Sequence, residues 1–551
     1  GAGGGGEGAD AAATPLPLAK LAYLSLSVFA QAVQIVMLFP LLVFMVIDYG
    51  RGDDPRLLGR YTGFLASCFP MGILLGTFFW GWLSDRVGRK PVLLFGLVSS
   101  AVLNVCFGLT RSYEAAVCIR ILTGVTNFVV GSLRSMVAEL TDDSNQAQAM
   151  SIYSMSWIVG SLLGPVFAGL LARPCVRFEC APGALFMRFP FLLPFLAISA
   201  LNVLSFVCIL LFVPETLAPE KRRSLASVVR RLARRGARAR QRGASRLKGV
   251  YVELPLSDGE GDDGGGEGVD GVELLAVGGR ASGGEKGSAD NGGGGGGGGG
   301  DEGGGSPAGV GGGAGGDESG LEGDAWEDER EAARLPQVPV YRDRKVVVGI
   351  GTYALCAFMF ILLDELFPLY ASYAPELGGL GFDTKKIGYA LTIGAVCTIP
   401  WLLFGYKPLI QKYGSVGSCA IGSAAFIFVA TLTPLMSVFR ATPGLLWSYI
   451  ALNGALRGVT ASTIFSCTAV IVNNSAPPGK LGFVNSLAQF SASLLRTVGP
   501  SLGGLLWSIA VTLKDVRGHQ TLPFLALGVF CVLQLMVTRA CPKSLNKSRR
   551  S

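Results

Sequence analysis

Long apolar runs restrict this chain more than any other feature of its sequence. Twelve segments of about 18 or more mostly apolar residues follow one another, and as helices they match the thickness of a bilayer's hydrocarbon core. Only 16% of the residues are charged, below the roughly 25% that is usual in soluble domains. The sequence therefore predicts an all-α membrane protein with twelve transmembrane helices. The runs cover approximately residues 21–47, 61–83, 91–110, 115–137, 150–172, 189–213, 346–371, 387–407, 415–438, 444–472, 484–511 and 521–538.

A long polar segment divides these runs into two sets of six. Residues 219–248 are strongly basic, with apolar residues at helical spacing, which fits either a helix on an anionic leaflet or a solvated linker. Residues 253–333 are rich in glycine and acid and cannot bury enough apolar surface to fold. The predicted domains are a disordered tail (1–18), a six-helix bundle (19–217), a disordered cytoplasmic linker (218–344), a second six-helix bundle (345–540) and a basic tail (541–551).

Basic residues indicate which side of the membrane each loop occupies. Loop 84–90, the linker, the loop with Lys407 and Lys412, and the C-terminal tail are basic, as cytoplasmic loops are. An even number of spans then places both termini in the cytoplasm. The protein is expected in either the plasma membrane or the vacuolar membrane. Cys175 and Cys180 fall on the opposite side, where a local disulfide is possible if that face is oxidising.

The two sets of runs are internal repeats of each other. SLLGPVFAGLLA (161–172) aligns with RTVGPSLGGLLW (496–507) at an offset of 335 residues. Segment 124–126, Gly-Val-Thr, recurs as 458–460 at an offset of 334. Two anchors with nearly the same offset indicate one duplication. Duplicated arrays of this kind are typical of transporters, whose site lies between the two halves, and we expect two pseudo-symmetric bundles.

Several motifs carry a resemblance to a known family. GWLSDRVGRKPVLL (81–94) resembles the signature loop of the major facilitator superfamily. RILTGVTN (120–127) and VGSLLGPVFAGLL (159–171) resemble the second motif and the antiporter motif of its proton-coupled drug-antiporter branch. Within that branch the chain is most similar to the zinc-induced facilitator-like group of plants and its fungal relatives. VPETL (213–217) and GGLGFDTKKIGYAL (378–391) fit the drug-antiporter branch as a whole. The segments that carry the similarity to the zinc-induced facilitator-like group are LFPLLVFMVIDYG, DELFPLYAS and NNSAPPGKLGFVNSLAQFSASLLRTVGPSLGGLLWS.

The resemblance implies a conformational motif at the helix ends. It implies that Asp85 faces the positive N-terminal end of the helix that begins near 482–485. Gly81 would permit close helix packing and Gly88 a tight turn, although the basic loop alone could also serve only to orient the helices. Glycine–proline pairs would bend or thin their helices, with pure packing as the alternative. Arg86 and Arg89 could pair with Glu139 and Glu215. The full set is Gly81, Asp85, Arg86, Gly88, Arg89, Glu139, Glu215, Gly160, Gly164, Pro165, Gly169, Gly499 and Pro500.

Ionisable and amide side chains inside the spans are the candidate site residues. An ionisable group there costs about 2.5–3.5 kcal/mol or more, so it is expected to have a function. Arg120 is predicted to serve proton coupling with Asp364 and Glu365, unless the two acids lie in the outer headgroup zone. Arg457 could bind an anionic group or pair with an acid. The amides could bind substrate or form interhelical hydrogen bonds. The predicted substrate-binding residues are Gln31, Gln34, Asn127, Asn453 and Arg457.

These observations predict a secondary active transporter of a small organic solute, namely a drug, metabolite or metal chelate. We expect proton-coupled antiport by alternating access, with a uniporter or a solute sensor of transporter fold as alternatives. A single histidine, His519, and no CxxC pair argue against a bare metal-ion carrier. No nucleotide-binding GxxxxGK[ST] loop occurs. We predict no enzyme activity, catalytic residue, cofactor, metal site or nucleic-acid partner. The expected partners are the substrate, the proton and the lipid bilayer, and the chain is expected to be a monomer.

Overall fold

The computed structural model describes residues 15–142, 145–176, 183–217, 219, 222, 342–477 and 480–546. Within these ranges the chain forms helices joined by turns and bends, with no strand. The predicted basic C-terminal tail is described up to residue 546. The predicted linker and N-terminal tail fall mostly outside the described residues, as does the basic segment 219–248. Their disorder stays a prediction.

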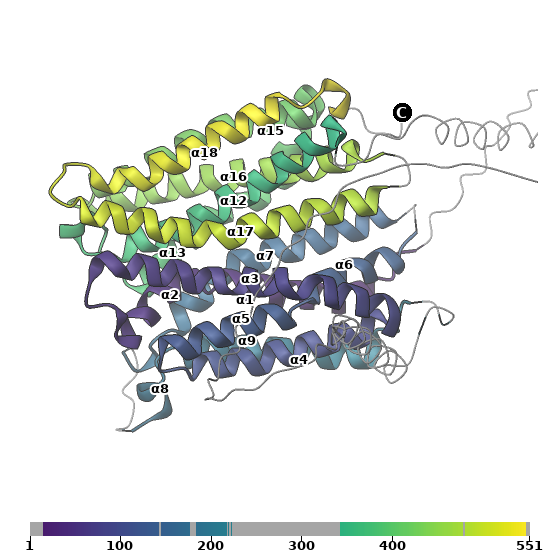
Figure 1. The fold of residues 1–551 in the computed structure, drawn as a ribbon, viewed down its shortest axis with the longest axis horizontal. Helices are drawn as coiled ribbons and strands as arrows, with labels where there is room; N and C mark the ends of the chain where they lie inside the picture. Colours follow the sequence, from purple (N-terminus) through teal and green to yellow (C-terminus); the bar gives the residue numbers. More distant parts are fainter. Residues whose placement is uncertain are drawn as a thin grey trace, which may run out of the picture. The chain divides into compact units, whose positions relative to one another are not determined.

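The first set of runs forms six spans from α1 to α9 (Figure 1). The first and fourth spans are each built from consecutive helices, and two short helices lie between the fifth and the sixth. The elements are α1 (Leu18–Val36), α2 (Phe39–Val46), η1 (Ile47–Arg51), α3 (Pro55–Val87), α4 (Arg89–Gly108), α5 (Tyr113–Thr126), α6 (Val129–Glu139), α7 (Gln146–Leu171), η2 (Pro174–Val176), α8 (Leu185–Arg188) and α9 (Leu192–Phe212).

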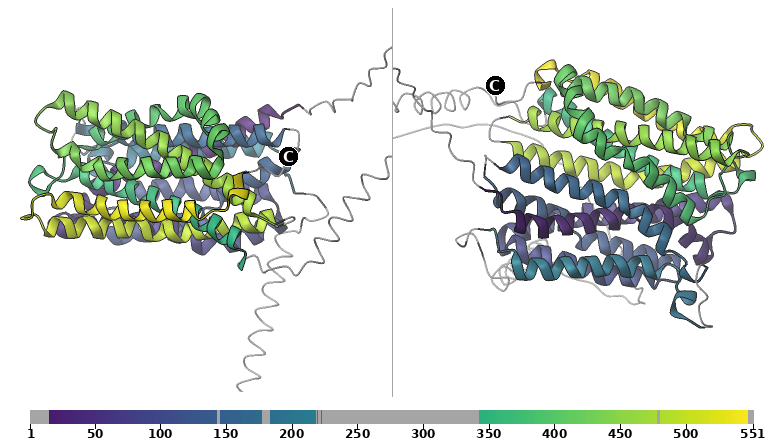
Figure 2. Two further views of the ribbon diagram at one scale, coloured as in Figure 1. Left: turned by 90° about the horizontal axis from the view of Figure 1, so that it is seen from above. Right: turned by 180° about the vertical axis from the view of Figure 1, so that it is seen from behind.

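The second set forms the spans from α12 to α18. The helices of each set lie together, coloured purple to blue and green to yellow in Figure 1 and in the right-hand view of Figure 2. The elements are α12 (Arg344–Ser372), η5 (Pro375–Leu377), α13 (Thr384–Val396), α14 (Thr398–Pro400), η6 (Trp401–Gly405), α15 (Tyr406–Leu432), η7 (Thr433–Ser437), α16 (Pro443–Ser475), α17 (Leu481–Thr512), η8 (His519–Thr521), α18 (Leu522–Arg539) and η9 (Lys543–Asn546).

The predicted number of membrane passes agrees with these helices. The described residues contain 11 apolar helical runs long enough to cross a bilayer, one of which, Thr384–Ser437, has 54 residues. At about 1.5 Å per residue that run is far longer than one crossing of a hydrocarbon core about 30 Å thick. Gly414 interrupts it with a φ of 70° and a ψ of 176°. The backbone turns there, so the run supplies two of the twelve passes.

Local sequence signals explain where several helices begin. The side chains of Asp54 and Asp343 accept hydrogen bonds from backbone N–H groups two residues on, at 2.8 and 2.9 Å. The Ser112 hydroxyl accepts one from a backbone N–H three residues on, at 3.3 Å. Pro55 and Pro443 occupy first helical positions, where a missing N–H costs nothing. The helices therefore begin where side chains satisfy N–H groups that the helix itself leaves free.

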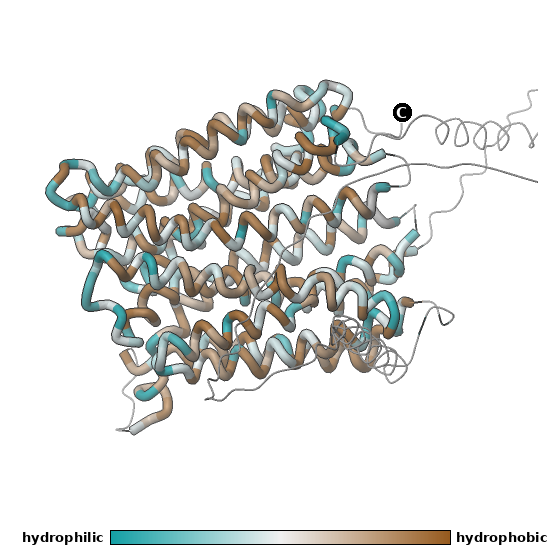
Figure 3. The backbone as a smooth tube through the Cα atoms, viewed as in Figure 1, coloured by the Kyte–Doolittle hydropathy of each residue, from teal (hydrophilic) through white to brown (hydrophobic). Residues whose placement is uncertain are grey.

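Apolar side chains cover the outside of the helices as well as the inside. In Figure 3 hydrophobic colour runs along the helix bodies, while hydrophilic colour gathers in the loops and at the helix ends. Large side chains such as Phe78, Phe404 and Phe428 are between 66% and 77% exposed. A protein in water seldom exposes so much apolar surface, but a bilayer covers it.

The closest backbone contacts between the two bundles lie toward one end. We call it the far end, opposite the linker end at which α1 and α12 begin. A Cβ on Gly63 of α3 would lie 2.2 Å from the Pro500 carbonyl oxygen of α17, and one on Gly504 would lie 2.0 Å from the Gly59 carbonyl oxygen. Next to these glycine contacts, the Ser501 hydroxyl donates to the Ser67 hydroxyl at 2.8 Å. Figure 1 shows α3 and α17 side by side. Glycine thus allows the two helix backbones to touch.

A second pair of helices joins the bundles near the same end. On α7 and α13, a Cβ on Gly388 would lie 2.6 Å from the Pro165 carbonyl oxygen and 3.1 Å from the Gly169 Cα. The Tyr373 hydroxyl, after α12, donates to the Pro55 carbonyl oxygen at 2.8 Å. The far end is therefore closed between the bundles on both sides.

Cys175, which follows α7 near the far end, forms a disulfide bond. Cys180, which the sequence suggests as its partner, lies outside the described residues.

Candidate functional site

Amide side chains in the first bundle form one continuous hydrogen-bonded chain. Asn127 donates to Gln31 at 2.9 Å, and Gln31 donates to Asn202 at 3.0 Å. Asn202 and Asn104 both donate to the Gln34 side-chain oxygen, at 3.1 and 2.9 Å. All five side chains are buried. These hydrogen-bonded amides link α1 to α4, α9 and the α5–α6 junction. They are thus interhelical hydrogen bonds, the alternative to substrate binding.

The amide chain limits what the predicted binding residues can offer a solute. Gln31 and Asn127 each bond to other amides of the chain, whereas the Gln34 Nε2 atom has no described partner. Sequence analysis missed Asn104 and Asn202, although a buried amide within an apolar run is a visible signal. The predicted substrate-binding role of Gln31, Gln34 and Asn127 stays a prediction.

Arg120 lies in α5 and is 5% exposed. Its guanidinium carbon sits 4.6 Å from the centre of the Phe69 ring and 5.5 Å from that of Phe107. Its Nε atom has no partner, and no carboxylate in the described ranges forms an ion pair with it. The aromatic faces are thus its visible electrostatic support.

Asp364 and Arg457 form an ion pair between α12 and α16. The Arg457 Nη2 atom donates to the Asp364 Oδ1 atom. The side chains are 33% and 22% exposed, so the pair is partly buried. A predicted coupling residue and a predicted binding residue therefore form a single unit that joins two helices of the second bundle.

Glu365 has a different environment from its neighbour in sequence, because successive helix positions point about 100° apart. It is 2% exposed, and its Oε1 atom has no described hydrogen-bond partner. A Cβ on Gly503 of α17 would lie 3.4 Å from the Glu365 Cγ. Glu365 is thus packed against α17 without a charge partner, where an ionised carboxylate is costly.

Asn453, on α16, is 8% exposed and donates to the Val429 carbonyl oxygen at 3.2 Å. This bond joins α16 to α15. Its predicted contact with substrate stays a prediction.

The charged loop between α3 and α4 forms a compact set of contacts at the linker end. Arg89 bonds to Glu139 at 3.1 Å and to Asp85 at 2.5 Å. Glu215 accepts the backbone N–H groups of Arg89 and Lys90, at 2.9 and 3.1 Å. These are free N–H groups at the start of α4, where a negative charge is favoured.

Three expectations for this loop are corrected. Arg86 pairs with neither predicted glutamate but lies 4.2 Å over the Trp82 ring. Glu215 binds backbone N–H groups rather than a guanidinium, because the start of α4 lies nearer to it. Gly81 has room for a side chain, since its Cβ would meet Phe128 only at 3.6 Å. Gly88, in contrast, has a φ of 128°, and its Cβ would lie 2.3 Å from a Glu215 oxygen.

Among the described residues, no hydrogen bond or ion pair joins Asp85 to the start of α17. The Asp85 side chain is 61% exposed and bonds to Arg89. The contact that the resemblance implies is therefore not seen in this structure, in which the closest backbone contacts between the bundles lie at the far end.

The glycine–proline pairs of α7 and α17 lie in close packing. A Cβ on Gly164 would be 2.9 Å from the Met37 backbone nitrogen, and one on Gly499 would be 2.5 Å from Ile361. Both helices continue through Pro165 and Pro500. These contacts support the packing alternative, and the bend stays a prediction.

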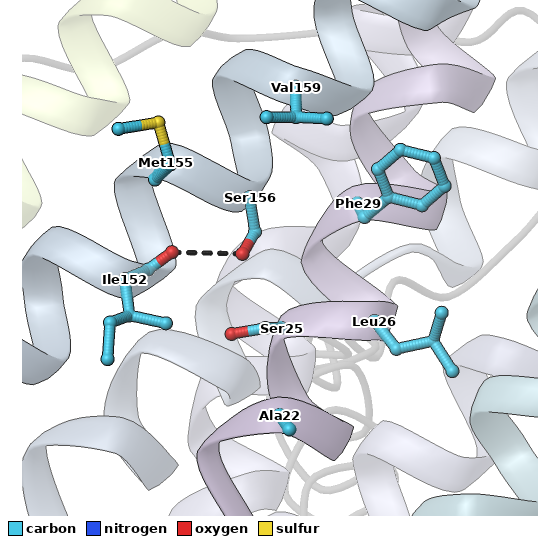
Figure 4. Close-up of a pocket in the computed structure, with 8 residues that line it drawn as sticks. All are labelled: Ala22, Ser25, Leu26, Phe29, Ile152, Met155, Ser156 and Val159. Carbon is cyan, nitrogen blue, oxygen red and sulfur yellow. Dashed lines mark hydrogen bonds between the residues drawn. The ribbon is translucent and has the colours of Figure 1, made fainter. Parts of the chain in front are cut away.

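A groove of about 440 Å³ lies between α1 and α7 (Figure 4). Its walls are mostly apolar, and the Ser156 hydroxyl donates back to the Ile152 carbonyl oxygen at 2.9 Å. None of the predicted site residues lines it. The lining residues are Ala22, Ser25, Leu26, Phe29, Ile152, Met155, Ser156 and Val159.

Sequence analysis also missed Arg496, which lies within the predicted run 484–511. It sits halfway along α17 and is partly buried. In the internal repeat it aligns with Ser161, so the duplication gives it no basic counterpart. A single arginine inside an apolar run was a sufficient signal.

A profile of the Major Facilitator Superfamily matches residues 24–500 of the chain. The chain is 27% identical over 534 residues to mfsB, a multidrug transporter of Aspergillus fumigatus, covering 94% of this chain and 82% of the relative. It is 26% identical over 497 residues to ZINC INDUCED FACILITATOR 1 of Arabidopsis thaliana, covering 89% and 84%.

Among solved structures, a D-xylose–proton symporter has the same fold. Its TM-score is 0.60 at 14% identity, covering 96% of this chain and 99% of the symporter. These similarities agree with the resemblance drawn from the motifs and with the expected fold.

Proposed function

The chain belongs to the major facilitator superfamily, and from this premise we propose that it is a proton-coupled antiporter of a small organic solute. The observation that carries the proposal is Glu365, a buried carboxyl beside the Asp364–Arg457 ion pair that has no charge partner of its own among the described residues. A carrier that exchanges protons needs a group that is charged in one conformation and neutral in another. Glu365 is suited to this because ionisation is costly where it lies and becomes cheaper when water reaches it.

Glu365 is connected to the contact between the bundles through two adjacent glycines. Gly503 packs on Glu365, and Gly504 touches the Gly59 backbone of α3 in the other bundle. A movement of α17 away from α3 would therefore change the packing of the carboxyl. This arrangement supports coupling between the protonation of Glu365 and the opening of the far end.

The closed far end supports alternating access. If the linker end is cytoplasmic, as the basic loops predict, the structure is closed toward the opposite side of the membrane. In the opposite conformation the linker end would close, and Asp85, now exposed, would meet the start of α17. Helix-end contacts of about 0.3–1 kcal/mol when exposed can bias such an equilibrium without locking it.

We place the solute site between the bundles, at the depth of Asp364 and Arg457. Both side chains are partly exposed, and a solute could compete for either member of the pair. The names of the relatives, a multidrug transporter and a zinc-induced facilitator, support a small organic solute or a metal chelate. Arg120, held between aromatic rings, would modulate the proton site from the first bundle.

Transport into proteoliposomes under an imposed pH gradient tests the proposal. The probes are fluorescent dyes of cationic, neutral and anionic character, together with pyranine to report internal pH. We expect the wild type to move at least one dye with the gradient, and Glu365→Gln to abolish this movement. Glu376→Gln, the same substitution at an exposed acid of η5, is the matched control. Gradient-driven movement that persists in Glu365→Gln would rule out this carboxyl as the coupling group.

A further inference from the structure

Arg496 lies in the middle of the membrane-spanning helix α17. It is halfway along α17, about 23 Å from either end of the helix at about 1.5 Å rise per residue. At this depth a long side chain cannot place its charge in the headgroup region, as it can near a helix end. An arginine in the middle of a span is therefore expected to face a partner or a water-filled space.

Arg496 belongs to the face of α17 that is directed toward the other helices. Gln489, Gly503 and Trp507 share this face by helical spacing. Gln489 donates to the Tyr353 hydroxyl of α12 at 3.0 Å. The Trp507 ring lies 5.4 Å from the Tyr373 ring, and a Cβ on Gly59 of α3 would meet it at 3.5 Å. The shared face thus contacts both α12 of its own bundle and α3 of the other.

The opposite face of α17 is apolar and exposed. Phe483, Leu494, Val498 and Leu505 are between 39% and 60% exposed. Side chains of this kind suit contact with lipid. Arg496 therefore points away from the lipid, into the space between α12 and α3 where the two bundles meet.

The acids near Arg496 do not neutralise it. Asp364 is paired with Arg457. Glu365 packs against Gly503, which is seven residues farther along α17, or about 10 Å along the axis. Among the residues that the structure describes, no hydrogen bond or ion pair involves Arg496. Arg457, in contrast, already has its carboxylate.

We propose that Arg496 binds the anionic group of the transported solute, which is an organic anion or zwitterion bearing a carboxylate, sulfonate or phosphate. The inference rests on the proposed transport function and names the substrate class of that site. A guanidinium offers parallel N–H groups that match the two oxygens of such a group. The solute would supply the negative charge that the described residues around Arg496 do not.

Ligand binding to the purified protein in nanodiscs tests this proposal. The probes are matched pairs of an acid and its neutral amide, such as hippurate with hippuramide and 2-naphthalenesulfonate with its sulfonamide, measured by thermal stabilisation. We expect at least one anion to bind the wild type more tightly than its amide. Arg496→Gln should weaken the binding of that anion by about 10- to 150-fold, which is the range for a hydrogen bond to a charged group. The affinity for the amide should not change.

Two further variants make the result specific. Arg496→Lys should retain part of the preference for the anion, because it keeps the charge and loses the paired N–H geometry. Arg539→Gln, at an exposed position at the end of α18, should behave as the wild type. Equal binding of acids and amides by the wild type, or full anion affinity in Arg496→Gln, would overturn the proposal.

The two proposals can fail separately. If dyes move with the pH gradient but no anion is preferred, only the substrate class is wrong. If anions bind through Arg496 but nothing moves with the gradient, the proton-coupled transport is wrong and the anion site stands.

Discussion

Replacing Gly63 by alanine should prevent the far end from closing fully. In the structure a Cβ at this position would lie 2.2 Å from the Pro500 carbonyl oxygen and 3.1 Å from the Gly504 Cα. Ordinary van der Waals contact begins at 3.4 Å. Both crowded atoms belong to the backbone of α17, so no side chain can rotate away. The two helices must therefore separate by about 1 Å, a displacement of the kind that overpacking forces on a backbone.

The size of the effect follows from the cost of overpacking. Adding a methyl group to a well-packed contact typically costs about 1–3 kcal/mol. That cost applies only to the conformation in which α3 and α17 touch, so it shifts the equilibrium toward conformations with an open far end by about 5- to 150-fold. The folded protein itself should remain stable, because the strain is relieved when the bundles part.

Distances between labels at the far end measure this shift. Labels introduced by amber suppression at Arg60 and Thr512, both exposed, report the separation of α3 and α17 without interference from the native cysteines. We expect a single short distance in the wild type to be replaced mainly by a longer one in Gly63→Ala. Turnover in proteoliposomes should fall in parallel, because the cycle includes the closed state.

The matched control is Gly351→Ala, a glycine of α12 with the same change in size. Its Cβ would lie 3.8 Å from the nearest atom, a methyl carbon of Val537, and should change neither the distance nor turnover. An unchanged distance distribution in Gly63→Ala would refute the view that the contact between α3 and α17 holds the far end closed.

Two other predictions follow from local geometry. Gly88→Ala should lower the free energy of unfolding by about 1–3 kcal/mol, because it places a side chain at a φ of 128° against Glu215. Gly81→Ala should have no effect. Equal melting temperatures for the two variants would show that the turn tolerates a side chain. Asp364→Asn and Arg457→Gln should each destabilise the second bundle, and the double variant should be less destabilised than their sum by about 0.5–3 kcal/mol; strict additivity of the unfolding free energies would show that the ion pair contributes nothing.

The sequence by itself determined the helices of this protein. A span must satisfy its backbone hydrogen bonds within a helix, since the hydrocarbon core offers no water, so long apolar runs translate directly into membrane helices. The internal repeat and the motif around Gly88 were equally visible, because they depend on residues that lie close together in the chain. Even the turn at Gly414 falls in the predicted gap between two runs, although the helical hydrogen-bond pattern continues through it.

The partners of polar side chains were decided only by the tertiary structure. Gln31 could have faced a solute, but α9 brings Asn202 within 3.0 Å of it from 171 positions away. The same holds for Asp364 and Arg457, which are separated by 93 positions. Residue type gives the capacity to bond, whereas the packing of the helices selects the partner.

The environments of Glu365 and Arg496 show the same limit most clearly. Asp364 and Glu365 are adjacent in sequence, yet one is paired and the other faces Gly503 without a charge partner. The sequence shows Arg496 only as a single basic residue in an apolar run. The contacts of α17 show that the helix face carrying Arg496 is directed toward α12 and α3. A helix fixes the angle between its own side chains, but only the neighbouring helices decide which of those directions is lipid, protein or the space between the bundles.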